Sequence, residues 1–170
     1  MINNKRFLIF LSKLAEVYPI GRVKHAPGTL ASLVALVFGY YILIIFKINF
    51  FLLFIFFFII FSYLLCEAHI KIYNKKDPNE VVIDEFGGQF LAILGIVDST
   101  NINHILTSLL LSFFLFRFFD ITKIGPIKKF EKLPGGIGII ADDLVAGLCA
   151  FLTQAAILTS ISQPLIIKTL

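Results

Sequence analysis

Long apolar segments dominate the chain and alternate with short polar ones. Each apolar segment approaches the roughly 20 residues that a helix needs to cross a hydrocarbon core of about 30 Å. The pattern therefore predicts about five membrane-spanning helices in a single domain of residues 1–170. The predicted spans are Leu30 to Phe46, Ile48 to Cys66, Val81 to Val97, Ile102 to Phe119, and Asp142 to about Gln163.

The first two predicted spans are separated only by Lys47. A single long helix is the alternative interpretation of this region. Two spans joined by a tight turn at Lys47-Ile48-Asn49 fit the thickness of a bilayer better.

The N-terminal segment, Met1 to Ile20, is amphipathic rather than uniformly apolar. Its apolar run, Phe7 to Leu11, is too short for a secretory signal and is not followed by a small-residue cleavage site. The spacing predicts a helix that lies in the membrane interface and ends near Tyr18-Pro19. Its apolar face carries Phe7, Leu8, Leu11, Leu14, Ala15 and Tyr18.

Composition supports a membrane protein. Hydrophobic residues make up 58% of the chain and charged residues 15%, and the mean hydropathy is +0.93. Soluble domains have an apolar share of about half and a charged share of about a quarter. We therefore expect an all-α, polytopic integral membrane protein. The net charge of +4 does not indicate nucleic-acid binding, because membrane proteins carry excess Lys and Arg that set their topology.

The distribution of positive charge supports the span count. If the predicted spans alternate in direction, only Lys47 and Lys168 of the 15 Lys and Arg residues fall on one side. The other side, rich in positive charge, is then the cytoplasmic side. This topology also predicts that the acidic residues of separate spans meet at the cytoplasmic face.

Five carboxylates are predicted to share that face: Asp84, Glu85, Asp120, Asp142 and Asp143. Ionisable groups inside a span are costly to bury and usually functional. Unpaired, these acids would repel one another, and Mg²⁺ prefers oxygen ligands and commonly joins carboxylates to substrate phosphate. We interpret all five as candidate metal ligands, and Asp84, Glu85, Asp120 and Asp143 as candidate catalytic residues. The two cysteines and three histidines are scattered, so the sequence indicates no zinc site.

Candidate phosphate-binding groups lie beside these acids. Arg117 and Lys123 supply positive charge, and the glycine-rich segment around Gly136 supplies backbone N–H groups. Thr29 either caps the helix that we expect to begin at Leu30 or contacts the phosphate. The adjacent pair Gly87-Gly88 allows close approach of a neighbouring helix or of a lipid head group. Together these groups are suited to metal-assisted phosphoryl transfer, in which one acid orients or deprotonates water.

Four motifs give the chain a specific resemblance. They are Pro27-Gly28-Thr29 with Ser32, VVIDEFGG at Val81 to Gly88, RFFDITK at Arg117 to Lys123, and GGIGIIADDLVAG at Gly135 to Gly147. With these motifs the sequence resembles the phosphatidylglycerophosphatase A family. The resemblance implies a Mg²⁺-dependent phosphatase of the bacterial inner membrane with a cytoplasmic active site. Its phospholipid substrate would be phosphatidylglycerophosphate, hydrolysed to phosphatidylglycerol and inorganic phosphate.

Other functions are compatible with parts of the pattern. Another lipid-phosphate phosphatase would use the same acids and cations. A CDP-alcohol phosphatidyltransferase also uses clustered aspartates, but its long Asp-Gly and Ala-Arg pattern is absent from this chain. A small cation transporter would need acids distributed through the bilayer, whereas here they are predicted at one face.

Overall fold

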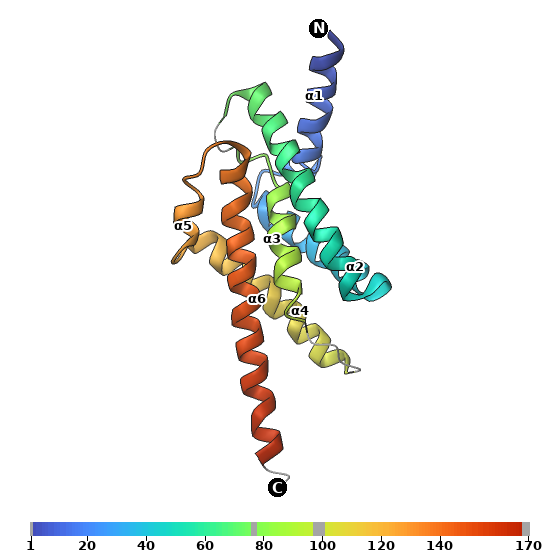
Figure 1. Cartoon of the computed structure of the whole chain (residues 1–170), viewed down its shortest axis with the longest axis vertical. Coiled ribbons are helices and arrows are strands. Elements are labelled where there is room, and N and C mark those ends of the chain that lie inside the picture. Colours follow the sequence, from blue (N-terminus) through green and yellow to red (C-terminus); the bar gives the residue numbers. More distant parts are fainter. Residues whose placement is uncertain (1, 76–77, 97–100, 168–170) are drawn as a thin grey trace.

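All secondary structure in the described residues is helical, as the sequence predicts. The computed structural model describes residues 2–75, 78–96 and 101–167. Figure 1 shows the helices and the positions of the two termini. The elements are α1 (Ile2–Ala15), the 3-10 helix η1 (Ile20–Arg22), α2 (Pro27–Tyr73), α3 (Ile83–Ile93), α4 (Ile102–Thr122), α5 (Ile127–Phe130) and α6 (Gly135–Ile167).

The helix α2 is a hairpin of two arms that meet at Lys47. This residue has φ 62° and ψ 173°, which interrupts the helical backbone. The arms then run side by side, as Figure 1 shows, and the rings of Phe38 and Phe54 lie 6.4 Å apart between them. The predicted turn at Lys47 is therefore confirmed, and the alternative of one continuous helix is wrong.

Three helices in the described part of the chain are long and apolar enough to cross a membrane: α2, α4, and α6 from Gly135 to Ser160. The predicted span from Val81 to Val97 is shorter in the structure, where α3 has 11 residues. At a rise of about 1.5 Å per residue, α3 is roughly half as long as a hydrocarbon core is thick. Its helix ends because Gly95 and Ile96 donate to carbonyls three residues back, which tightens the last turn. Val97 lies outside the described residues.

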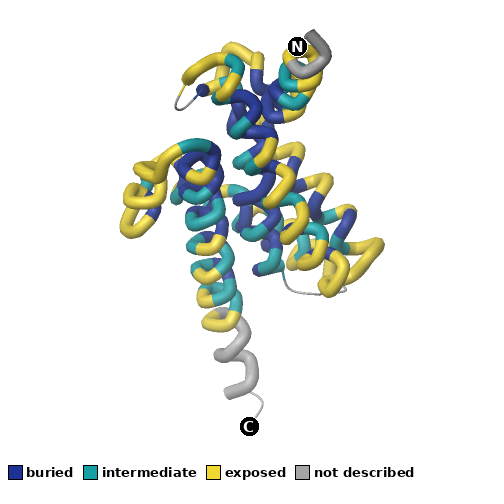
Figure 2. The backbone as a smooth tube through the Cα atoms, turned by 45° about the horizontal axis from the view of Figure 1, so that its top comes forward, coloured by how far each residue is buried: buried dark blue, intermediate teal, exposed yellow. Residues whose placement is uncertain are grey.

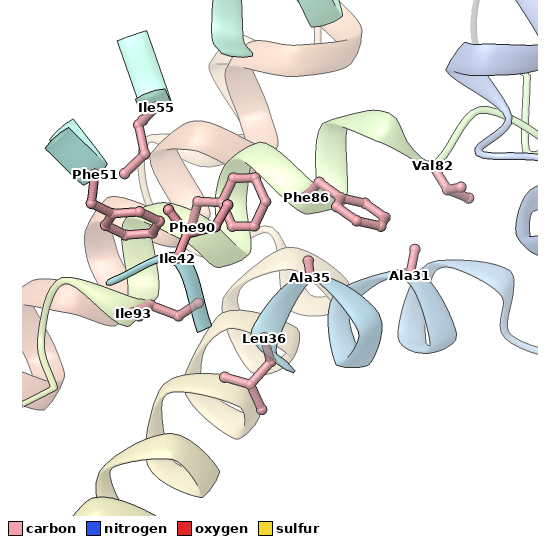
Figure 3. Close-up of a cluster of buried hydrophobic side chains, with 10 residues drawn as sticks. All are labelled: Ala31, Ala35, Leu36, Ile42, Phe51, Ile55, Val82, Phe86, Phe90 and Ile93. Carbon is pink, nitrogen blue, oxygen red and sulfur yellow. The ribbon is translucent and has the colours of Figure 1, made fainter. Parts of the chain in front are cut away.

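The short helix α3 lies at the centre of the fold and packs against both arms of α2. Phe90 is fully buried, and its ring contacts Phe51 of the second arm at 6.1 Å and Phe38 of the first at 6.4 Å. Figure 3 shows Phe86, Phe90 and Ile93 of α3 among apolar side chains from the α2 arms. The core therefore forms around the helix that carries Asp84 and Glu85.

Apolar side chains also cover the outside of the molecule. Figure 2 shows buried residues where the helices meet and exposed residues along the outer sides of the helices. Phe56 and Phe57 on α2 are each 59% exposed, and Phe114 on α4 is 63% exposed. An exposed apolar surface of this extent is typical of a protein that contacts lipid. The structure thus agrees with membrane association.

The N-terminal helix α1 packs against the C-terminal end of α2. Ser12 and Ala15 are fully buried, and Ser12 Oγ lies 2.9 Å from His69 Nδ1. The helix ends at Ala15, earlier than predicted, and the predicted apolar face is divided. Ala15 contacts protein, whereas Phe7 and Tyr18 are more than half exposed. Placement of α1 in the membrane interface stays a prediction.

The backbones of α3 and α6 touch at two glycines. A Cβ atom at Gly147 would overlap with the carbonyl oxygen of Gly88. A Cβ atom at Gly88 would lie 2.6 Å from the carbonyl oxygen of Asp143 and would overlap with the Phe116 ring. The sequence left two roles open for Gly88, close approach of a neighbouring helix or of a lipid head group. The structure shows helix packing. Gly87 differs, because its Cβ would meet only the end of the Leu144 side chain, at 3.3 Å.

We expect Gly88→Ala to separate α3 from α6 and to destabilise the protein by about 1–3 kcal/mol, because backbone and a buried ring must move. Gly87→Ala is the matched control and should be tolerated, since a flexible side-chain end can shift. Thermal melting of both variants in detergent, followed by circular dichroism, measures the difference. Equal melting temperatures for the two variants would contradict the proposed backbone contact.

Candidate active site

The first wall of the site is the N-terminal turn of α2. The helix begins at Pro27, with Ala26 as its N-cap residue, so the predicted start at Leu30 and the capping role of Thr29 are wrong. Thr29 lies instead in the first turn and lines a cavity. Ser32 Oγ donates to the carbonyl oxygen of Gly28 at 2.8 Å, which fixes that side chain beneath the turn.

The second wall is the N-terminal turn of α3, which carries Asp84 and Glu85. The Glu85 N–H donates to Asp84 Oδ1 at 3.1 Å, so the two adjacent acids are held together. The Glu85 carboxylate lies directly over Gly28, where a Cβ atom would overlap with Oε1. Gly28 is therefore required for the close contact between α2 and this carboxylate.

The third wall is the C-terminal end of α4. Arg117 and Asp120 share a face, as their spacing predicts, and Arg117 Nη1 lies 2.7 Å from Asp120 Oδ2. The same nitrogen donates to Ser32 Oγ at 3.3 Å. Arg117 consequently joins α4 to the second turn of α2. Its Nε atom is buried and has no hydrogen-bond partner among the described residues.

Lys123 follows α4 and connects it to α6. Its Nζ lies 2.5 Å from Asp142 Oδ2, 3.1 Å from Asp120 Oδ1 and 3.8 Å from Asp143 Oδ1. Partial burial favours the neutral amine, but the Asp143, Asp142 and Asp120 carboxylates outweigh this effect and raise the Lys123 pKa above its ordinary value. Lys123 therefore remains positively charged at neutral pH and offsets part of the carboxylate charge.

The five predicted acids all line one cavity, but they fall into two groups. Asp84, Glu85 and Asp143 each offer a carboxylate oxygen, and these oxygens lie within 4.8 Å of one another. Such a set suits one divalent cation with oxygen ligands. Asp120 and Asp142 are instead paired with Arg117 and Lys123.

Two carboxylate oxygens in this region are buried and lack a hydrogen-bond partner within the described part of the chain. They are Glu85 Oε2 and Asp142 Oδ1. Buried polar atoms are rarely left unpaired, so each one indicates a partner such as an ion, water or substrate. The arrangement therefore fits a bound cation beside Glu85 and a polar ligand beside Asp142.

The cavity has a volume of about 750 Å³, within the usual range for small-molecule sites. It opens between the α2 N-terminus, the turn at Pro78 and Asn79, and the loop that precedes α6. Its charged lining residues are Asp84, Glu85, Arg117, Asp120, Lys123, Glu131, Lys132, Asp142 and Asp143.

The phosphate-binding role predicted for Gly136 is not supported. Its N–H donates to Glu67 Oε1 at 2.7 Å, and the residue is buried against α2 near Tyr63 and Cys66. Gly135 and Gly138 line the cavity instead. Glu67 thus binds the N-terminus of α6, where a negative charge is favourable.

Sequence reasoning did not assign roles to Ser32, Glu67 or Lys132. Ser32 was visible as part of a motif, since it follows Gly28 by one helical turn. Glu67 and Lys132 stand in ordinary charged flanks, so only the three-dimensional structure shows their positions.

Comparison with known proteins agrees with this geometry. The profile of the phosphatidylglycerophosphatase A family matches residues 13–158. The chain belongs to this family. Phosphatidylglycerophosphatase A of Haemophilus influenzae is 35% identical over 145 residues, which cover 85% of this chain and 86% of the relative. Phosphatidylglycerophosphatase A of Escherichia coli is 31% identical over 136 residues, covering 79% and 76%.

Membership in the phosphatidylglycerophosphatase A family identifies the chain as an enzyme, a phosphatase. A third relative, from Bacteroides thetaiotaomicron, carries a name that provisionally assigns it phosphatidylinositol-3-phosphatase activity. It is 35% identical over 80 residues, which cover 47% of this chain and 48% of the relative. No solved structure is significantly similar to the chain.

We expect Gly28→Ala to lower kcat/KM by about tenfold or more while leaving the melting temperature nearly unchanged. The new methyl group would displace the flexible end of Glu85 rather than a backbone atom. Phosphate release and thermal melting, measured on the same preparation, test both parts. Gly87→Ala serves again as the control, and full activity of Gly28→Ala would contradict the assigned position of Glu85.

Proposed function

We propose that the protein hydrolyses the terminal phosphate monoester of phosphatidylglycerophosphate in a Mg²⁺-dependent reaction, giving phosphatidylglycerol and inorganic phosphate. One observation carries the proposal: three carboxylates suited to a cation share a cavity with Arg117 and Lys123. The apolar exterior supports a lipid substrate, and the names of two relatives specify this one.

Asp84, Glu85 and Asp143 would hold the Mg²⁺ ion. When bound, the ion would neutralise negative charge on the phosphate oxygens. Arg117 is suited to bind the same phosphate, because its buried Nε–H has no partner of its own within the described residues. Its Nη1 contacts to Asp120 and Ser32 hold the guanidinium in place.

The attacking group in this proposal is water. Asp142 is suited to orient it, because Lys123 holds one carboxylate oxygen and the buried Oδ1 remains available to accept a hydrogen bond. The water oxygen attacks phosphorus, and the bond between phosphorus and the glycerol oxygen breaks. The glycerol oxygen takes up one proton of the attacking water and leaves as the free hydroxyl of phosphatidylglycerol, and the other water proton stays on the released phosphate.

A phosphatase acting on another lipid phosphate is the second candidate, favoured by the name of the Bacteroides thetaiotaomicron relative. The two candidates are distinguished by comparing phosphate release under identical conditions from three lipids: phosphatidylglycerophosphate, phosphatidic acid and phosphatidylinositol 3-phosphate.

A cation transporter is less well supported, because the five acids line one cavity at the ends of helices. A CDP-alcohol phosphatidyltransferase has no supporting observation in the structure.

We further propose that the chain crosses the bacterial inner membrane five times, with the cavity facing the cytoplasm. The two arms of α2, together with α3, α4 and α6, would provide the crossings. Figure 1 supports this alternation, because the second arm of α2 and α4 run toward the end of the molecule that carries the N-terminus, whereas α3 and α6 run away from it. The short α3 would cross together with the residues that follow it, or where the bilayer is locally thin.

Replacing Asp84 or Asp143 with Asn should abolish Mg²⁺-dependent phosphate release, because each variant removes a charged ligand while keeping the side-chain shape. The assay uses phosphatidylglycerophosphate in detergent micelles. The activity of the wild-type protein is measured with a chelator and again after Mg²⁺ is restored. The difference defines the metal-dependent part of the activity. Lys129→Gln, a change at an exposed residue of α5 that does not line the cavity, is the control. Full turnover by both aspartate variants would refute the ligand assignment.

Cysteine labelling tests the proposed topology. Lys24 and Lys47 are both exposed and, by the proposal, lie on opposite sides of the membrane. In a background lacking Cys66 and Cys149, a membrane-impermeant maleimide should label Lys47→Cys in intact cells. It should label Lys24→Cys only after permeabilisation. The reverse pattern would contradict the cytoplasmic orientation.

A further inference from the structure

Lys132 is a cation at the rim of the cavity without a fixed partner. It lines the cavity and is exposed, and no ion pair or hydrogen bond holds it anywhere in the described residues. Arg117 and Lys123 differ, because each contacts a carboxylate within 3 Å. Among the three cations that line the cavity, Lys132 is therefore the one whose charge is free for a ligand.

The loop that carries Lys132 is fastened to the start of α6. Gly138 packs against this loop so closely that a Cβ atom there would overlap with the carbonyl oxygen of Leu133. The Leu133 N–H donates to the carbonyl oxygen of Phe130 at 3.0 Å, which closes the loop into a turn. Lys132 therefore has a defined backbone position in the loop that leads into α6, which begins three residues later at Gly135.

Exposed apolar residues near Lys132 indicate the depth of this loop. Phe130 is 37% exposed and Leu133 is 36% exposed. Aromatic and apolar side chains beside lysines are typical of the headgroup region of a membrane. Lys132 is then at the level where the phosphates of lipids lie, whereas Asp84, Glu85 and Asp143 lie deeper in the protein.

The proposed substrate carries two phosphate groups joined by a three-carbon glycerol. Its terminal monoester must reach the inner carboxylates and Arg117, while its phosphodiester stays next to the acyl chains, at headgroup depth. A cavity of about 750 Å³ accommodates more than a single phosphate. The substrate therefore requires a second anion site near the rim, at the position where Lys132 lies.

We propose that Lys132 binds the phosphodiester of the substrate and so selects lipids in which a phosphodiester and a terminal phosphate monoester are joined by glycerol. This inference rests on the proposed function. The adjacent Glu131 lines the same rim with the opposite charge. The opposite charges of Lys132 and Glu131 therefore largely cancel in their general attraction of anions to the rim. Selection then depends on direct contact between Lys132 and the phosphodiester.

Lys132→Gln is expected to raise KM for phosphatidylglycerophosphate by roughly tenfold and to leave kcat within about twofold, because the contact is distant from the reacting phosphorus. Two lipids, each with a single phosphate, distinguish the phosphodiester site from the monoester site when they are used as competing ligands. Inhibition by phosphatidylglycerol, which has only the phosphodiester, should weaken to the same extent. Inhibition by phosphatidic acid, which has only the monoester, should not change.

The assays use the full-length protein in neutral detergent micelles, which remove attraction to an anionic membrane surface. Lys129→Gln is the matched control, since Lys129 is an exposed lysine of α5 that does not line the cavity, and it should leave all constants unchanged. Lys132→Arg should retain most of the wild-type affinity. Because Lys132 is exposed, we expect the variants to keep the wild-type melting temperature.

Unchanged constants for Lys132→Gln, or equal weakening of phosphatidylglycerol and phosphatidic acid inhibition, would overturn the inference while leaving the proposed function intact. An equal effect of Lys129→Gln would also overturn it, by assigning the effect to general charge. Failure of the wild-type protein to release phosphate from phosphatidylglycerophosphate would refute the proposed function itself.

Discussion

Mutual repulsion among five carboxylates is the constraint on which the arrangement of the helix ends depends. Acids from three helices share one cavity in a chain whose exterior is largely apolar. These acids are buried or half-buried, so their charges need compensation from protein groups or an ion. Lys123 supplies part of it by contacting Asp120 on α4 and Asp142 on α6, and Arg117 pairs with Asp120 while reaching Ser32 on α2. The two cations that offset the charge therefore also join α4 to α6, through Lys123, and α4 to α2, through Arg117.

This compensation divides the acids by role. Asp120 and Asp142 already have cationic partners. Asp84, Glu85 and Asp143 form a compact group, and among the described residues only Lys123, 3.8 Å from Asp143, lies at ion-pairing distance from it. A divalent cation is the partner that this second group fits best. The cavity thus offers a position for a metal, two fixed inner cations and a free lysine at its rim, which suits a lipid headgroup with two phosphates.

Close backbone packing brings these groups within reach of one another. Gly88 and Gly147 allow α3 and α6 to touch, and Gly28 allows the Glu85 carboxylate to lie against the first turn of α2. The aromatic cluster around Phe90 holds α3 from the other side, between the arms of the α2 hairpin. These three glycines therefore shorten the distances between helices, whereas the N–H of Gly136, which was predicted to bind phosphate, donates to Glu67.

The sequence by itself determined the all-helical class, the break at Lys47, and the five acids and two cations, Arg117 and Lys123, that meet in one cavity. These features follow from local properties, since apolar length sets membrane helices and alternation of spans brings distant acids to one face. Only the tertiary structure decided that α2 begins at Pro27, that α3 is short and central, and that Lys123 forms an ion pair with Asp142. Those outcomes depend on which side chains face each other across helix contacts. Sequence spacing specifies the face of a single helix, but the distance between two helices depends on packing at positions such as Gly88 and Gly147.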